Sequence, residues 1–322
     1  MNQAWELLSS TLARLLPSAH DSMVQQEQVT IGAHPNNLPL NRYNNIIPFD
    51  HHLIQLSTQH YLNASHVHVA QTRRPFVIAQ CPMHPDYHGA DTTNEFWQSV
   101  VECRVKCIVN LARVEKGYSG AALYWPQRET ETFLTHDWKV ECLSVDHLEP
   151  THCLTRRRLR VTPRLHSTAL TTSANNSVSG MLELNHYHFQ RWPNYDVATS
   201  PAETCQLLQC VLRERNVEDE DEEVAATLVH CSGGVGRSGT FVAAVCCVEQ
   251  LLDESECGEH TAHVAAKTTT RGDAASLANR LGTIVQTLRE QRHPWMVEGW
   301  EQFLFCSRLV LAVMEDKQAT KK

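Results

Sequence analysis

The segment from residue 225 to residue 241 constrains this chain more than any other. Its sequence, AATLVHCSGGVGRSGTF, joins an apolar run to a glycine-rich turn and then to a helical pattern. Backbone N–H groups in such a turn point into one concavity, and the start of the following helix adds positive potential. The segment therefore predicts a buried strand, a loop suited to a dianionic phosphate, and a helix.

Cys231 and Arg237 give this loop a chemical function. The loop N–H groups, the helix dipole and Arg237 would all favour the thiolate of Cys231, which makes it a candidate nucleophile. The planar guanidinium of Arg237 can hold two phosphoryl oxygens, and Ser238 can hydrogen-bond the sulfur and ease its departure. We expect the residues between them to bind phosphate: Ser232, Gly233, Gly234, Val235 and Gly236.

Other interpretations of the loop explain less of it. Residues 234–239, GVGRSG, match the GxGxxG dinucleotide pattern, but residues 249–254, where a second strand should end in an acid, have a helical pattern. The phosphate-loop NTPase pattern fails because no lysine precedes Ser238 or Thr240. A buried structural cysteine would leave an arginine and a serine at the helix start unexplained.

Composition excludes several classes of protein. The 322 residues are 42% hydrophobic and 20% charged, which is ordinary for a soluble globular protein. The formal charge of −8 argues against a nucleic-acid partner, which would favour a basic face. No apolar run approaches the ~18 residues of a membrane span, so no membrane partner is expected. We interpret four arginines as one solvated edge of a strand rather than a binding patch: Arg156, Arg157, Arg158 and Arg160.

The cysteines and histidines suggest neither disulfides nor a metal site. Twelve cysteines are scattered without a CxxC pair, which is typical of small buried side chains in a reducing compartment and favours a cytoplasmic location. The 19 histidines form no HExxH or similar spacing, and His186 and His188, which alternate along a predicted strand, are interpreted as structural. We expect no metal and no cofactor.

Periodicity and residue type predict the secondary structure. The predicted strands are residues 61–70, 76–80, 107–111, 138–143, 182–189 and 225–230. The predicted helices are residues 94–106, 201–215 after a capping box at Ser200, 238–252, 277–291 and 300–314. This order predicts an α/β (α+β) fold in which helices flank a central mixed, twisted sheet and the last third is helical.

The His-Cys-x5-Arg-Ser motif at 230–238 resembles the signature of the classical protein tyrosine phosphatases, the cysteine-based, non-receptor type. Further segments resemble motifs of that family in the family's order: 41–43, 48–51, 61–65, 80–82, 96–97, 113–117, 124–126, 186–187, 192–193 and 200–201. The resemblance implies one catalytic domain over residues 30–315. Residues 1–29 would form an N-terminal helical extension, and 316–322 a polar tail.

The resemblance also implies roles for single residues. Tyr43 would pack against the phenyl ring of phosphotyrosine and make the pocket too deep for phosphoserine and phosphothreonine. Glu115 would pair with Arg237, while His230 and Trp192 would support the site. The implied mechanism has two steps, in which a cysteinyl phosphate forms while an acid protonates the leaving phenolate, and water then hydrolyses this intermediate.

The loop that supplies this acid departs from the family pattern. The family has Trp-Pro-Asp, whereas this chain has Trp192-Pro193-Asn194, and an amide cannot deliver a proton. Asp196 is a substitute because residues i and i+2 of an extended segment project to the same side. It could equally be a polar turn residue, so both interpretations stay open.

Two binding positions also differ from the family. Asn45 stands where the family usually has an aspartate that binds the substrate backbone, so peptide affinity should weaken. Glu298 and Gln302 stand where the family has two glutamines that place the hydrolytic water. Glu298 could activate water as a base, or its charge could repel the phosphate dianion.

The sequence therefore predicts a protein tyrosine phosphatase that acts on phosphotyrosine-containing proteins and is slowed by Asn194 in the general-acid position. The alternative is a pseudophosphatase that binds such proteins without efficient turnover. The two share fold, pocket and ligand, so the sequence separates them only through residues 194, 196 and 298. A monomer is expected.

Overall fold

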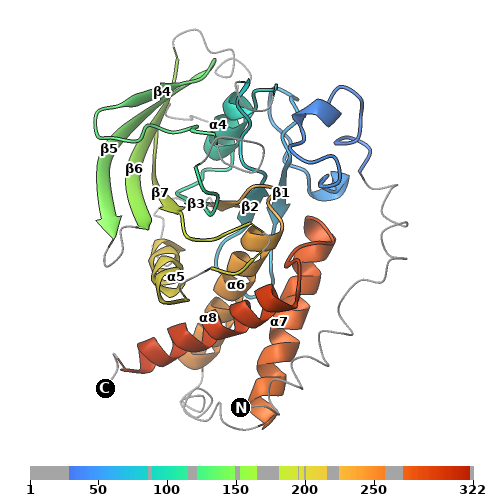
Figure 1. Cartoon of the computed structure of the whole chain (residues 1–322), viewed down its shortest axis with the longest axis vertical. Helices are drawn as coiled ribbons and strands as arrows, with labels where there is room; N and C mark the ends of the chain where they lie inside the picture. Colours follow the sequence, from blue (N-terminus) through green and yellow to red (C-terminus); the bar gives the residue numbers. More distant parts are fainter. Residues whose placement is uncertain are drawn as a thin grey trace.

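The computed structural model describes residues 29–85, 89–114, 122–148, 153–164, 181–194, 196–198, 201–215, 225–257 and 271–319. One twisted sheet of eight strands lies at its centre, with the strand order β1-β2-β8-β3-β7-β6-β5-β4 (Figure 1). The strands are β1 (Ala64–Val67), β2 (Phe76–Ala79), β3 (Cys107–Asn110), β4 (Thr132–Leu134), β5 (Trp138–Leu148), β6 (Leu154–Pro163), β7 (Leu182–Phe189) and β8 (Thr227–His230).

The sheet is mixed, and its parallel part lies in the middle. Strands β2, β8, β3 and β7 run parallel to one another, whereas β1 pairs antiparallel with β2, and β6, β5 and β4 continue antiparallel from β7. All four residues of β8 are buried, as expected for a strand with parallel neighbours on both sides. The loop after a central parallel strand opens at the carboxyl edge of the sheet, where α/β proteins bind their ligands.

Helices cover both faces of the sheet. The helices are α4 (Thr93–Glu102), α5 (Pro201–Arg215), α6 (Gly236–Cys257), α7 (Arg271–Gln291) and α8 (Trp300–Ala319), with short 3₁₀ turns η2 (Leu38–Leu40) and η3 (Asp50–His52). Helices α5, α7 and α8 pack against α6 (Figure 1). The core on that face includes the fully buried stretch from Phe241 to Val248, so this part of α6 is apolar all round.

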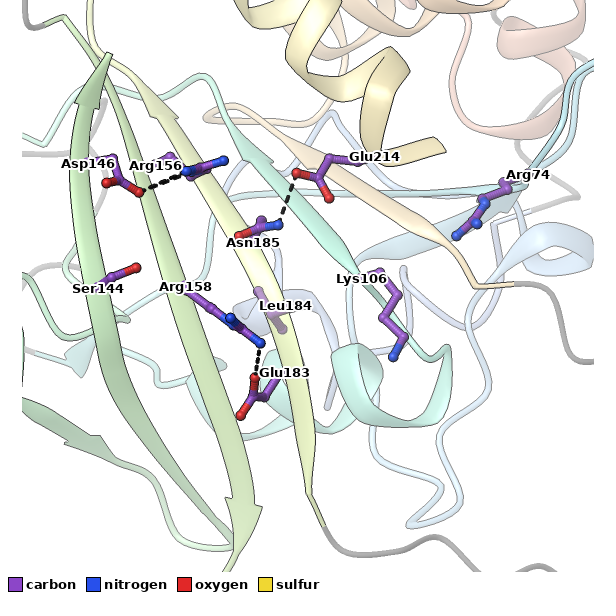
Figure 2. A pocket seen from close by; sticks show the side chains of 10 residues that line it. All are labelled: Arg74, Lys106, Ser144, Asp146, Arg156, Arg158, Glu183, Leu184, Asn185 and Glu214. Carbon is purple, nitrogen blue, oxygen red and sulfur yellow. Dashed lines mark hydrogen bonds and ion pairs between the residues drawn. The ribbon is translucent and has the colours of Figure 1, made fainter. Parts of the chain in front are cut away.

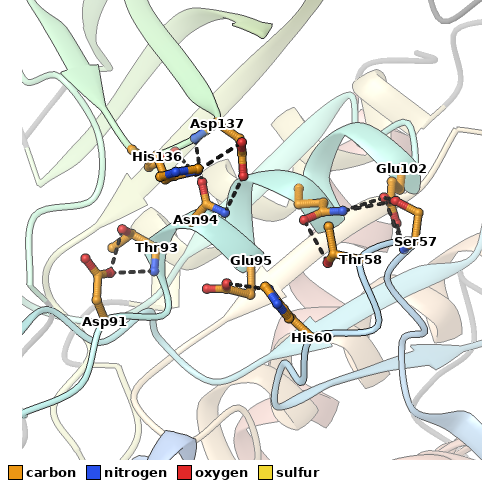
Figure 3. Close-up of polar contacts among 12 residues, drawn as sticks. Ser57, Thr58, His60, Asp91, Thr93, Asn94, Glu95, Glu102, His136 and Asp137 are labelled. Atoms are coloured by element: carbon orange, nitrogen blue, oxygen red, sulfur yellow. Dashed lines mark hydrogen bonds and ion pairs between the residues drawn. The ribbon is translucent and has the colours of Figure 1, made fainter. Parts of the chain in front are cut away.

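Helix α4 covers the opposite face. Its Phe96, Trp97 and Val100 pack with the other side chains of β2, β3 and β8. Polar contacts fix both its ends (Figure 3), including the bond from Asn94 Nδ2 to Asp137 Oδ2 (2.9 Å) and that from the Ser57 N–H to Glu102 Oε2 (3.1 Å). The helix is thereby tied to two segments far from it in the sequence.

These observations confirm the predicted fold class and most of the predicted elements. Each predicted strand and helix has a counterpart, and the helix over residues 201–215 has the predicted bounds. Strand β4 was not predicted, and β6 was anticipated only as a strand that carries the four arginines, without bounds. Residues 1–28 of the predicted N-terminal helical extension lie outside the described residues, as does Ser200 of the capping box. Among the described helices, none combines the length and apolar character of a membrane span.

The interpretation of the arginine group as a solvated edge is wrong in part. The arginines lie on β6, which is an interior strand between β5 and β7. On one face they pair with acids of the neighbouring strands, such as Asp146 and Glu183. Arg157 points to the other face, is 8% exposed, and donates from Nε to the Gln127 carbonyl (3.1 Å). Cross-strand acids make this basic strand possible, and they are distant in sequence.

A pocket of about 400 Å³ lies on the paired face of this strand (Figure 2). Its lining includes the Arg156–Asp146 and Arg158–Glu183 ion pairs, and Glu214 accepts a hydrogen bond from Asn185 Nδ2 (2.9 Å). Exposed pairs of this kind contribute only about 0–1 kcal/mol each to stability.

Candidate active site

The loop between β8 and α6 has the geometry of an anion cradle around one sulfur atom. The Gly234 N–H points at Cys231 Sγ, with an N-to-S distance of 3.3 Å. Gly234 has φ +71°, and a Cβ at this position would collide with the Ala79 carbonyl oxygen. Glycine is therefore required here both by the backbone conformation and by the close approach of β2.

Cys231 is electrostatically activated by its surroundings. Burial by itself would raise the pKa of the thiol, but Arg237, the Ser238 hydroxyl and the backbone N–H groups of Ser238 and Val235 outweigh it and lower the pKa below its ordinary value. The Ser238 hydroxyl is buried without another hydrogen-bond partner among the described residues, so it is available to the sulfur. Every other described cysteine with a shifted pKa has it raised by burial, for example to about 11 at Cys81.

Arg237 joins the phosphate loop to two other segments. It is 3% exposed, and its Nη1 donates to the carbonyls of Leu111 (3.1 Å) and Trp192 (3.0 Å). Its Nη2 donates to Asn194 Oδ1 (2.8 Å). Among the described residues these bonds use three of the five N–H groups and leave Nε and one Nη2 hydrogen, which can together form a fork with an oxyanion. Glu115, the predicted partner of Arg237, lies outside the described residues.

The structure brings Asn194, and not Asp196, to the phosphate loop. Asp196 is exposed, and its Oδ1 accepts from the adjacent Val197 N–H (2.7 Å). Trp192 fixes this turn, because its buried ring donates from Nε1 to the Asp196 carbonyl (3.0 Å) and packs edge-on against Phe305. The alternation expected of an extended segment does not hold here, since residue 194 lies in a turn.

His230, the last residue of β8, supports the phosphate loop. It is fully buried, and its Nε2 lies 2.6 Å from the Tyr124 hydroxyl while its Nδ1 lies 3.2 Å from the Cys231 carbonyl oxygen. Burial lowers the pKa of His230 to about 3, so the ring is neutral near pH 7. His186 and His188 are buried on the same face, and burial lowers both of their pKa values, that of His188 to about 4.

The predicted substrate loop also reaches the phosphate loop. The Tyr43 hydroxyl lies 2.6 Å from Ser232 Oγ, and its ring edge lies 3.3 Å from where a Cβ of Gly233 would be. Arg42, which has no assigned role in the sequence analysis, donates from Nε to the same Ser232 hydroxyl (3.0 Å). Asn45 is exposed, and its carbonyl oxygen lies 3.2 Å from His293 Nε2.

Glu298 and Gln302 approach the loop from the other side. A Cβ at Gly236 would collide with Glu298 Oε2 and would lie 3.0 Å from Gln302 Nε2. Gln302 Oε1 accepts from the Glu298 N–H (2.9 Å) and from the Thr240 hydroxyl (3.2 Å). Burial raises the pKa of Glu298, although Arg237 opposes this shift.

Sequence reasoning missed Arg292, which holds the backbone of the cradle. It is fully buried and donates to the carbonyls of Gly233 and Gly234 (both 3.3 Å) and to Asn63 Oδ1 (2.6 Å). Burial lowers its pKa to about 10, so it stays a cation near neutral pH. A single arginine near a helix end carries no sequence signal for this role, because its acceptors are backbone carbonyls that are distant in the sequence.

Comparisons with known proteins agree with this geometry. A family model described as protein-tyrosine phosphatase matches residues 37–312. Mouse tyrosine-protein phosphatase non-receptor type 2 is 30% identical over 69% of this chain, and human receptor-type tyrosine-protein phosphatase eta is 28% identical over 87%. The chain spans only 50% and 18% of these two relatives.

The structure is similar to a solved one. The catalytic domain of human protein tyrosine phosphatase non-receptor type 18 superposes with a TM-score of 0.71 and 20% sequence identity, over 96% of both chains. At this identity the likeness establishes the fold alone.

Proposed function

This chain belongs to the protein-tyrosine phosphatase family, and from that premise we propose that it hydrolyses phosphotyrosine in proteins through a cysteinyl-phosphate intermediate. The observation that carries the proposal is the sulfur of Cys231, which lies in a ring of backbone N–H groups beside a buried guanidinium and has a lowered pKa. A thiolate in an anion cradle is the arrangement needed for attack on a phosphate ester.

In the first step the Cys231 thiolate attacks phosphorus, and the bond to the phenolic oxygen breaks. The loop N–H groups and the Nε and Nη2 hydrogens of Arg237 hold the equatorial oxygens, whose charge they stabilise through the transition state. Tyr43 lies at the edge of Gly233, where it can contact the phenyl ring. In the second step water attacks phosphorus and the thiolate leaves, assisted by the Ser238 hydroxyl.

The proposed enzyme is slow, because no acid occupies position 194. A positioned general acid typically contributes 10²–10⁴-fold to the rate. Asn194 donates no acidic proton and instead accepts a hydrogen bond from Arg237, while Asp196 faces solvent. This pair of observations also supports the second candidate function, a pseudophosphatase that binds phosphotyrosine proteins and turns them over poorly.

The proposal includes a cellular setting. Phosphotyrosine-containing proteins are the partners, and a cytoplasmic monomer that participates in signalling is the form we expect. Support for a reducing compartment comes from the eleven cysteines whose side chains the structure describes, all of which are free thiols.

The experiment compares para-nitrophenyl phosphate and a phosphotyrosine peptide between about pH 5 and pH 8, with Cys231→Ser as the blank. We expect turnover that the substitution abolishes, together with a phosphorylated cysteine trapped by acid quench. Tight peptide binding without turnover in the wild-type protein would instead favour the pseudophosphatase.

A further inference from the structure

The segment between α7 and α8 is held rigidly against the phosphate loop. Val297 has φ +61°, a conformation that a β-branched residue adopts only when its surroundings impose it. Arg289 of α7 imposes it by donating to the carbonyls of Met296 (3.0 Å) and Val297 (3.2 Å). A Cβ at Gly239 would lie 2.8 Å from the Val297 nitrogen. Only glycine therefore fits where the segment crosses the first turn of α6.

This rigid segment places the next residue, Glu298, at the phosphate loop. Its carboxylate lies on the bare backbone of Gly236, the residue next to Arg237, and a Cβ there would be 2.9 Å from Glu298 Cδ. Gln302 fixes the position from behind, because its buried Oε1 accepts from the Glu298 N–H. The strained backbone of Val297, the buried Arg289 and Gly236 together place the Glu298 carboxylate at the phosphate loop.

Among the residues that the structure describes, the other candidates for proton transfer do not reach this place. The side chain of Asn194 is an amide and has no acidic proton. The exposed Asp196 carboxylate accepts a hydrogen bond from the N–H of the next residue, Val197. His230 lies beneath the loop with both nitrogens near partners. Hydrolysis of a cysteinyl phosphate nevertheless needs a group that accepts a proton from the attacking water.

Building on the proposed phosphatase function, we propose that Glu298 is the general base that activates water for hydrolysis of the Cys231 phosphate. As the water oxygen bonds to phosphorus, a water proton passes to the Glu298 carboxylate. The P–S bond breaks and its electron pair stays on sulfur, which regenerates the thiolate. Inorganic phosphate leaves, and Glu298 then releases its proton to solvent.

The charges around Glu298 suit a base. Arg237 faces it from α6, Arg289 lies behind it with its N–H groups on backbone carbonyls, and Glu301 of α8 lies near Gly299. Burial raises the pKa of Glu298 more than Arg237 lowers it, which makes it a stronger base than a carboxylate in water. The negative charge of Glu298 is tolerated beside the phosphate site because the positive charge of Arg237 lies next to both the carboxylate and the phosphate.

The test is Glu298→Gln, which keeps the shape of the side chain and its hydrogen bonding but removes the base. We expect kcat for para-nitrophenyl phosphate, whose leaving group needs no acid, to fall on the order of 10²-fold, with kcat/KM within about threefold, because kcat/KM reports the steps up to phosphoenzyme formation. Rapid mixing should show a burst, and the phosphorylated cysteine should accumulate. The acid-side fall of kcat with decreasing pH should disappear.

Two further variants make the result specific. Glu301→Gln is the matched control, because this exposed glutamate lies three residues away and loses the same charge; it should leave the kinetics unchanged. Asn194→Asp in the Glu298→Gln background should restore turnover by supplying a carboxylate from the other side of the cradle.

Different outcomes overturn different claims. If Glu298→Gln leaves kcat unchanged or raises it, or lowers kcat and kcat/KM equally, Glu298 is not the base while the phosphatase function stands. If the wild-type protein shows no turnover and no phosphorylated cysteine, both proposals fall.

Discussion

Replacing Asn194 by aspartate tests whether the missing acid limits this protein. The Asn194 amide oxygen lies 2.8 Å from Arg237 Nη2, at the mouth of the cradle that holds Cys231. A carboxyl group there would be close enough to protonate a leaving phenolate after a small rotation. Position 194 thus already places a side chain at the guanidinium, and Asn194 lacks only an acidic proton.

The expected gain follows from two opposing effects. A positioned acid is worth 10²–10⁴-fold, or about 2.7–5.5 kcal/mol of barrier. A carboxylate so close to the Arg237 guanidinium would, however, have its pKa lowered by about 1–3 units, and its ion pair would compete with phosphate for the guanidinium. Only a small fraction of such a carboxyl group is protonated at pH 5.5, so we expect Asn194→Asp to raise kcat for a phosphotyrosine peptide by about 10-fold there, with a smaller gain at pH 8 and a higher KM.

The assay compares two leaving groups across pH. Tyrosine phenolate, with a pKa of about 10, needs protonation as it leaves, whereas para-nitrophenolate is a much weaker base and gains little from an acid. The ratio of the two kcat values should therefore change with the substitution. An equal gain for both substrates, or none for the peptide, would refute the reasoning, and Asp196→Asn in the same background should leave the gain intact.

The remaining predictions concern stability. The Arg215–Glu249 ion pair is fully buried (Nε to Oε1 2.6 Å), so Arg215→Met should lower the free energy of urea unfolding by about 3–5 kcal/mol, whereas Arg215→Met with Glu249→Leu should lower it less because no buried charge is left unpaired. Gly234→Ala should lower the free energy of unfolding by at least about 2 kcal/mol in the same assay, because the residue has φ +71° and faces the Ala79 carbonyl. A loss near zero would contradict the close approach of Gly234 to β2. Burial holds the pKa of His188 at about 4 and that of His230 at about 3. As the pH falls, the unfolded chain therefore binds these protons before the folded protein does. The free energy of unfolding should be at its full value above pH 6.5 and should decline below it, by about 2 kcal/mol per histidine at pH 5. A denaturation midpoint equal at pH 7 and pH 5 would exclude this contribution.

The fold was largely predictable because its core elements are local and apolar. The six predicted strands are short runs of β-branched and aromatic residues, and the helix of residues 201–215 carries its own start signal. The interior position of β6 escaped prediction because its arginines are stabilised by Asp146 and Glu183, which lie on neighbouring strands. Arg156 lies 10 residues from Asp146 and Arg160 lies 23 residues from Glu183, so the two halves of each pair belong to different strands.

The centre of the site was predictable for a related reason. Cys231, the glycines and Arg237 lie within seven consecutive residues, so a single strand–turn–helix unit places them without help from the rest of the chain. The glycines permit the turn, the helix start provides the positive potential, and the sequence alone specifies both.

The groups that decide how fast this site works come from elsewhere, and only the tertiary structure places them. Asn194 meets Arg237 across 43 residues of sequence, and Glu298 reaches Gly236 because Arg289 and Val297 fix a distant segment. Sequence spacing left Asp196 as a substitute acid, but the buried ring of Trp192 fixes the turn that points it to solvent. Local sequence determines the nucleophile and its cradle through backbone geometry, whereas proton transfer depends on side chains whose separation is set by the packing of the whole domain.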